Sequence, residues 1–182
     1  MFFGAAGPPI VHDDFTFELT SGPGTMLIRA MPVQFTGGAL PWTVKSVKWD
    51  NVEIIDSGIE LSAGRNVDGL EIVLTNRVQE VSGRVTNAKG EIAQDATVVI
   101  FSQNPEQRPG GRFAGTSRLD QNGRYRVRTL PPGDYFAIAV DYVDPNRRSG
   151  DPTYFEELSR DATRFTLTEG ETRALDLKLP VQ

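Results

Sequence analysis

The sequence predicts an all-β protein made of tandem antiparallel β-sandwiches, the first of which is incomplete. Three observations indicate this fold class. Short stretches of alternating apolar and polar residues recur along the 182 residues and are typical of half-buried strands. The 18 glycines and 12 prolines are generous and suit the many turns of a sandwich. A strand–turn–strand pattern also occurs twice, and an internal repeat of this kind indicates tandem modules.

The repeat centres on a Pro-Gly turn flanked by two strand-like stretches. The turn is Gly22-Pro23-Gly24 in the first copy and Pro131-Pro132-Gly133 in the second. The flanking stretches are residues 15–19 and 26–31, then 125–128 and 135–140. Further along, each copy has a Leu-x-x-Gly motif, starting at Leu61 and at Leu167, that precedes alternating leucine and isoleucine residues. Both ends of the module are therefore repeated.

In the first half, five strand-like stretches follow an N-terminal arm. The expected strands are residues 15–19, 26–31, 41–49, 51–55 and 70–74. The apolar parity changes at Ser46, which predicts a β-bulge in the third strand. Residues 1–14 are small, apolar and interrupted by proline, so we expect an extended arm there.

The second half contains a full set of strands and one helix. The expected strands are residues 81–86, 96–101, 116–119, 125–128, 135–140, 164–167 and 173–179. Asp151 followed by Pro152 is typical of an N-cap with proline at the first helical position, which predicts one short helix over residues 152–160. By strand parity, we expect these side chains in the core: Val98, Ile100, Tyr125, Val127, Leu175 and Leu177. We expect these in solvent: Arg126, Arg128, Asp176 and Lys178.

These elements predict a first module over residues 1–77 and a complete second module over residues 78–182. Only the arm, residues 1–14, precedes the first strand of the first module, which leaves room for one strand at most. An incomplete sandwich has an open edge and an uncovered apolar face. Either the arm folds back as a strand, or the edge pairs by β-augmentation with other modules of the parent chain or with neighbouring copies. We favour the intermolecular pairing.

Composition excludes several classes of partner. The formal net charge of -5 argues against nucleic acid, which needs a basic surface. The 19 lysines and arginines are scattered, and the densest pair, Arg147-Arg148, suits a solvated loop rather than a patch. The sequence has no stretch long and apolar enough for a membrane span and no signal-peptide pattern, so we expect no membrane insertion.

The residues needed for catalysis are also missing. His12 is the only histidine and there is no cysteine, so a zinc site of the usual kind has no ligands. A Ser-His-Asp triad would need His12 as its base, and no nucleophile motif stands near it. The carboxylate pairs Asp13-Asp14 and Glu156-Glu157 consist of neighbours whose side chains diverge, which does not make a hydrolytic dyad. We therefore predict that the protein is not an enzyme and holds no cofactor.

One loop is a minor candidate for calcium. Asp141, Asp144 and Asp151 stand close together in sequence, and carboxylate oxygens are the ligands that Ca²⁺ prefers. Their spacing matches no EF-hand loop, and an Asp before Pro is also typical of turns and helix caps. The structural interpretation is favoured.

Aromatic residues provide a minor candidate for a carbohydrate site. A sugar ring can stack on aromatic side chains such as Trp42, Trp49, Tyr142, Tyr154 and Phe155, and of these we take Trp42, Tyr142 and Tyr154 as the candidates. The alternative is that large aromatics in a sandwich pack in its core or between domains. We favour packing and keep a glycan as an alternative ligand.

The second half resembles a known family. The motifs that carry the likeness are Gly83-Arg84-Val85-Thr86, Ala96-Thr97-Val98-Val99, Asp120-Gln121-Asn122-Gly123-Arg124-Tyr125 and Leu130-Pro131-Pro132-Gly133-Asp134-Tyr135. In this order they resemble the bacterial carboxypeptidase regulatory-like domain, which is related to Cna B-type and transthyretin-like or Ig-like sandwiches. The first half matches only the later strands of such a module.

This resemblance implies a function without catalysis. Members of the family are mostly non-catalytic parts of larger periplasmic, secreted or cell-surface proteins. We therefore expect a structural or interaction module of an extracytoplasmic bacterial protein, used for spacing, presentation or protein contact. Two alternatives stay open: a carbohydrate-binding module, and a strand-exchanging subunit of a surface fibre.

Overall fold

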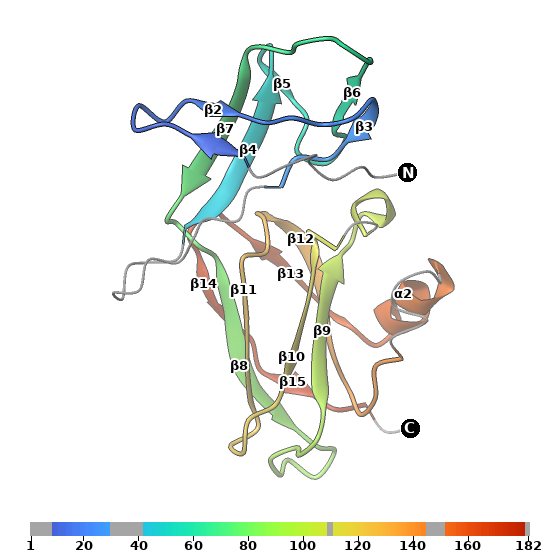
Figure 1. Cartoon of the computed structure of the whole chain (residues 1–182). Helices are drawn as coiled ribbons and strands as arrows, with labels where there is room; N and C mark the ends of the chain where they lie inside the picture. The colour runs from blue at the N-terminus through green and yellow to red at the C-terminus, as the bar shows by residue number, and fades with distance from the viewer. Residues whose placement is uncertain (1–8, 30–41, 109–110, 145–151, 181–182) are drawn as a thin grey trace. The chain divides into compact units, whose positions relative to one another are not determined.

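The computed structural model describes residues 9–29, 42–108, 111–144 and 152–180 (Figure 1). The chain divides into two compact units, Met1–Asn76 and Arg77–Gln182, which we call the first and second unit. Strands dominate both, and α2 (Pro152–Ser159) is the α-helix that the described residues contain. The all-β fold class and its short helix are confirmed, whereas the origin of the units as tandem modules stays a prediction.

The second unit is a sandwich of two sheets. One sheet has the order β10 (Ala114–Arg118), β9 (Thr97–Ser102), β12 (Gly133–Val140) and β13 (Thr163–Leu167). The other has the order β11 (Arg124–Arg128), β8 (Glu80–Thr86) and β14 (Thr172–Ala174), and β15 (Leu177–Lys178) also pairs with β8. A short 3₁₀ helix spans Pro105–Gln107. β14 and β15 run parallel to β8, and the other pairs are antiparallel.

The strands β9 and β12 are buried on both faces. On β9, Val98 and Ile100 belong to the core between the two sheets, whereas Val99 and Phe101 belong to a second cluster on the outer face. α2 covers that face, and the ring centroid of Phe155 lies 4.9 Å from that of Phe101. An uninterrupted apolar run such as 98–101 is what two-sided burial requires. No helix among the described residues has the length and apolar character to cross a membrane.

Strand parity predicts the core of the second unit well. Five of the expected core side chains are buried: Val98, Ile100, Tyr125, Val127 and Leu177. The four expected in solvent are exposed: Arg126, Arg128, Asp176 and Lys178. Leu175 is only partly buried, although it packs against the core.

Leu175 departs from the prediction because the last strand is broken. The expected strand over 173–179 is split into β14 and β15, and Leu175-Asp176 lies between them. At this break the Oδ1 atom of Asp176 accepts a hydrogen bond from the backbone N–H of Arg84 at 2.8 Å. The backbone of Leu175 lies so close to Gly83 that a Cβ atom there would be 2.0 Å from the carbonyl oxygen of Leu175.

Two tyrosines fix the backbone around this core. The hydroxyl of Tyr125 donates to the carbonyl oxygen of Leu175 at 2.6 Å, and that of Tyr135 donates to the carbonyl oxygen of Pro131 at 2.7 Å. Burial raises the pKa of both phenols above its ordinary value. Each tyrosine therefore fills the core while its polar atom satisfies a turn or strand carbonyl.

Among the described residues, the first unit contains three small sheets. These are β1 (Ile10–Val11) with β2 (Phe17–Glu18), β3 (Gly24–Met26) with β6 (Ile59–Leu61), and β5 (Val52–Glu53) with β4 (Thr43–Trp49) and β7 (Leu70–Thr75). Its core is formed by Met26, Ile28, Val47, Ile54 and Ile59. The register of β4 on β7 shifts between Val44 and Ser46, which confirms the predicted bulge.

The start of the first unit differs from the expected extended arm. Ile10–Val11 pairs antiparallel with Phe17–Glu18, so this part of the arm folds back within the chain, the option that we favoured less. Phe15 was expected to start a half-buried strand, but it lies in the turn with φ of 67° and is 90% exposed. Residues 1–8 of the arm lie outside the described residues.

The repeated sequence motifs have the same strand register in both units. Gly24, after the first Pro-Gly turn, is paired with Leu61. Gly133, after the second, is paired with Leu167. In each case the glycine of the turn therefore lies opposite the leucine of the Leu-x-x-Gly motif. The two sequence repeats therefore also share a structural feature, the pairing of the turn glycine with this leucine.

Candidate ligand pocket

The candidate site in the first unit is built on the hairpin between β4 and β5. Trp49 pairs with Val52, which leaves a two-residue loop of Asp50 and Asn51. Both loop residues have positive φ, 47° and 64°, as a type I′ turn requires. Asp and Asn tolerate this conformation better than other non-glycine residues. The turn therefore places Trp49 and Val52 side by side at the end of the hairpin.

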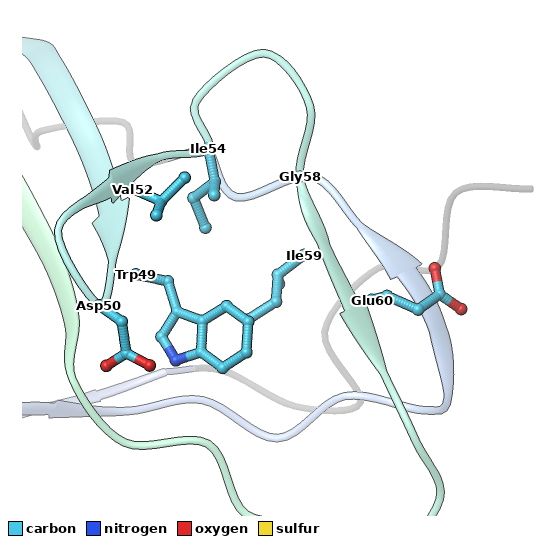
Figure 2. Close-up of a pocket in the computed structure, with 7 residues that line it drawn as sticks. All are labelled: Trp49, Asp50, Val52, Ile54, Gly58, Ile59 and Glu60. Atoms are coloured by element: carbon cyan, nitrogen blue, oxygen red, sulfur yellow. The ribbon is translucent and has the colours of Figure 1, made fainter.

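An open pocket of about 420 Å³ lies beside this turn. Its lining residues are Trp49, Asp50, Val52, Ile54, Gly58, Ile59 and Glu60. Figure 2 shows the side chains of Val52, Ile54 and Ile59 grouped around the indole of Trp49, with the carboxylate of Asp50 near the indole nitrogen. The volume falls within the range of small-molecule sites, about 300–1,000 Å³.

Trp49 is held in place by both packing and a hydrogen bond. Its side chain packs against the core of the first unit, and its Nε1–H donates to the carbonyl oxygen of Asp68 at 3.1 Å. The opposite wall of the pocket is formed where Gly58 lies close to β3. A Cβ atom on Gly58 would be 2.6 Å from the carbonyl oxygen of Met26. The pocket is therefore part of the folded unit rather than of an unsupported loop.

The chemistry of the lining suits binding rather than catalysis. Asp50 and Glu60 are the titratable lining residues. The Oε2 atom of Glu60 accepts a hydrogen bond from the hydroxyl of Thr25 at 2.6 Å, and its side chain points away from the apolar group (Figure 2). The two carboxylates therefore do not face each other across the pocket as a hydrolytic pair would. What remains is an apolar surface with one carboxylate.

Of the groups considered for catalysis, His12 and the pair Asp13-Asp14 lie in the β1–β2 turn, whereas the pair Glu156-Glu157 lies on α2. The Nε2 atom of His12 is 3.9 Å from Oε1 of Glu18 at an exposed position. Asp14 Oδ1 accepts hydrogen bonds from the hydroxyl and the backbone N–H of Thr16, at 2.7 and 3.0 Å. These bonds lower the pKa of the Asp14 carboxyl and identify it as a turn cap.

The calcium candidates are only partly described. Asp141 is exposed and Asp144 is half-buried, whereas Asp151 lies outside the described residues. Within the described part of the chain, no three acidic, histidine or cysteine side chains are grouped as a metal site requires. The calcium hypothesis stays a prediction.

Of the three carbohydrate candidates, two are exposed and one is buried. Trp42 is 48% exposed in the first unit, and Tyr142 is 73% exposed in the second. Tyr154 is only 6% exposed, because α2 directs it onto the outer face of β9 and β12 with Phe155. A buried ring offers no face to a sugar, so the assignment of Tyr154 is corrected to packing.

The sequence analysis named Trp49 among the aromatics that could stack on a sugar, but it did not predict the pocket around this residue. The signal in the sequence was Asp50-Asn51 between an apolar strand end and Val52, which is a recognisable two-residue turn. The rest of the lining comes from residues 54–60, whose approach to Trp49 depends on the pairing of β3 with β6. That part could not be read from local pattern.

Comparison with known families identifies the second unit. The sequence profile of the family described as "Carboxypeptidase regulatory-like domain" matches residues 80–180, which run from the start of β8 to beyond the end of β15. A comparison with curated protein sequences found no match.

Solved structures show more distant likeness. The TIE protein of Bacillus anthracis is 15% identical, with a TM-score of 0.37 over 76% of this chain and 23% of that one. Catechol 1,2-dioxygenase from an Acinetobacter species is 16% identical, with a TM-score of 0.33 over 56% of this chain and 52% of that one. A putative carbohydrate binding protein from Pseudomonas aeruginosa is 14% identical, with a TM-score of 0.32 over 55% of this chain and 87% of that one. The chain thus spans about half or less of the first two, and likeness at this level carries no argument about function.

Proposed function

The chain belongs to the carboxypeptidase regulatory-like domain family, and we propose on this basis that it is a non-catalytic module of a larger extracytoplasmic bacterial protein. Its role is to space, present or contact other modules of the parent chain or neighbouring copies. The observation that carries the proposal is the extent of the match, which includes every strand of the second unit.

The construction of the second unit supports this role. A spacer must keep its shape without help from a ligand, and this unit buries apolar side chains on both faces of β9 and β12. The hydroxyls of Tyr125 and Tyr135 are satisfied by backbone carbonyls, so they are engaged in structural contacts. The side chains that would support catalysis in the first unit serve as turn caps or lie at exposed positions.

The first test is whether the second unit is an autonomous module. We expect residues 79–182 alone to unfold in a single cooperative transition, because this fragment is of ordinary domain size and contains its complete core. Circular dichroism during thermal and urea unfolding measures this, with the whole chain as the control. A gradual, non-cooperative transition of the fragment would show that the unit is not a module.

A second candidate function is carbohydrate binding, which the open pocket at Trp49 favours. An indole beside a carboxylate offers both a stacking surface and a hydrogen-bond acceptor. The pocket replaces the platform expected from Trp42, Tyr142 and Tyr154, whose last member is buried.

A glycan array followed by calorimetry on any bound sugar tests this candidate. We expect Trp49→Leu to weaken binding about tenfold, since an aromatic contact contributes about 0.5–1.5 kcal/mol beyond its area. Trp42→Leu is the matched control, because Trp42 is an exposed tryptophan of the same unit that does not line the pocket. Melting temperatures of both variants establish that the fold is kept. If Trp42→Leu abolishes binding while Trp49→Leu leaves it intact, the pocket is not the sugar site.

A further inference from the structure

One exposed sheet face of the second unit gathers four arginines. β11 has arginine at alternate positions, 124, 126 and 128, and these side chains are exposed while Tyr125 and Val127 between them are buried. The pairing of β11 with β8 places Arg124 directly opposite Arg84, which is also exposed. We call Arg84, Arg124, Arg126 and Arg128 the arginine face. These arginines are scattered in the sequence, and the pairing of β11 with β8 brings them together on one face.

A single glutamate organises one half of this face. Oε1 of Glu80 lies 3.1 Å from Nε of Arg126, and Oε2 lies 2.6 Å from Nε of Arg128. Glu80 is 15% exposed, whereas the two arginine side chains are 63% and 50% exposed. The carboxylate thus fixes both guanidinium groups through their inner nitrogens. A guanidinium has five N–H donors, so each still has outward donors, already oriented for a second carboxylate.

Arg84 and Arg124 form the other half of the face. The acidic groups near them accept hydrogen bonds from the protein's own backbone. Oδ1 of Asp120 accepts from the backbone N–H groups of Asn122 and Arg124 at 2.8 and 2.9 Å. These bonds, followed by the charges of Arg124 and Arg84, lower the pKa of Asp120. Oδ1 of Asp176 accepts from the backbone N–H of Arg84. The two carboxylates therefore serve a turn and a strand break, while Arg84 and Arg124 are exposed.

We propose that the arginine face binds an extended acidic segment of a partner protein that carries carboxylates on alternate residues. In a strand, residues two apart are separated by about 6.6 Å, and this is the spacing of the three arginines along β11. An extended partner segment has the same period, so its carboxylates meet successive guanidinium groups. This inference deepens the proposed function as a protein-contact module and rests on it.

Charge distribution favours such a segment over a continuous polyanion. The chain has a net charge of -5, so a long polyanion that extends beyond the face meets an opposing field. On the face itself, Glu80 contacts Arg126 and Arg128, and next to it Asp120 and Asp176 accept hydrogen bonds from the backbone of Arg124 and Arg84. Carboxylates on alternate residues can contact the guanidinium groups and avoid these three acidic side chains, whereas carboxylates on consecutive residues cannot.

Fluorescence anisotropy with labelled synthetic peptides tests the proposal. One peptide alternates four glutamates with four threonines, and its control has four consecutive glutamates followed by four threonines. At about 20 mM salt we expect the alternating peptide to bind the whole chain about fivefold more tightly, and binding to weaken strongly at about 300 mM salt. A heparin oligosaccharide serves as the polyanionic glycan probe.

Matched variants locate the binding. We expect the double substitution Arg126→Gln with Arg128→Gln to weaken binding of the alternating peptide about fivefold, since each exposed charge pair contributes modestly. Arg124→Gln keeps both arginine partners of Glu80, and we expect it to weaken binding of the alternating peptide about twofold. Lys89→Gln with Arg160→Gln removes the same charge from exposed positions elsewhere and should change nothing. Melting curves confirm that each variant is folded.

Three outcomes would overturn the proposal. These are equal affinity for the two peptides, tighter binding of the heparin probe than of the alternating peptide, and equal losses in the arginine-face and control variants. None of them affects the cooperative unfolding of residues 79–182, so failure here is distinguishable from failure of the module function.

Discussion

Leu177→Ala is expected to destabilise the second unit by about 2–5 kcal/mol, the usual cost of deleting a buried leucine side chain and leaving a cavity. Leu177 is 4% exposed and belongs to the core between the two sheets. It lies on β15, where it is paired with Val85 of β8. Urea unfolding of the fragment 79–182 measures the free energy of unfolding directly.

The neighbouring residue provides the control for this change. Lys178 lies on the same strand and is exposed, so Lys178→Ala should change the free energy of unfolding by less than about 0.5 kcal/mol. If the two substitutions have equal effects, the side chains of β15 do not point as described, because a register shift by one residue exchanges the two faces.

Gly83→Ala is expected to cost at least about 3 kcal/mol, at or above the upper end for overpacking of a core. The added Cβ atom would lie 2.0 Å from the carbonyl oxygen of Leu175 and 2.6 Å from its carbonyl carbon. Backbone atoms cannot move aside as a side chain can, so β8 and the strand break must separate. The hydrogen bond from Tyr125 to Leu175 would be strained by the same movement.

Gly22→Ala is the matched control for this steric effect, because no atom lies within 4 Å of the Cβ position at Gly22. Thermal unfolding of the whole chain compares the two variants. If Gly83→Ala melts like the unsubstituted chain, the close approach of Leu175 to β8 is not a feature of the protein in solution.

Local pattern was sufficient for most of the fold. Alternation placed Tyr125 and Val127 inside and the arginines between them outside, and a parity change located the bulge at Ser46. The strand predicted to start at Phe15 was wrong because alternation alone does not show that a tight turn with positive φ lies there. The last strand was predicted as continuous because its break depends on Gly83, a residue about 90 positions earlier in the sequence.

The sites were harder to predict for the same reason. Tyr154 was a candidate for stacking on a sugar, but it is buried because α2 packs on β9 and β12. The arginine face depends on the register that brings Arg84 to Arg124 across 40 positions of sequence. Strand pairing over such distances is set by the whole core, so residue spacing does not reveal which charges share a surface.

The helix α2 gives the second unit two sides of different electrical character. It covers the outer face of the β10-β9-β12-β13 sheet (Figure 1), and it presents the exposed acidic side chains of Glu156 and Glu157. The opposite sheet presents guanidinium groups instead. The helical side carries charges of both signs, because Arg108 and Arg164 lie over the rings of Phe101 and Phe136 there. The exposed residues of β11 are all cationic, so an anionic partner is attracted to the strand side and its charge selects the side on which it docks.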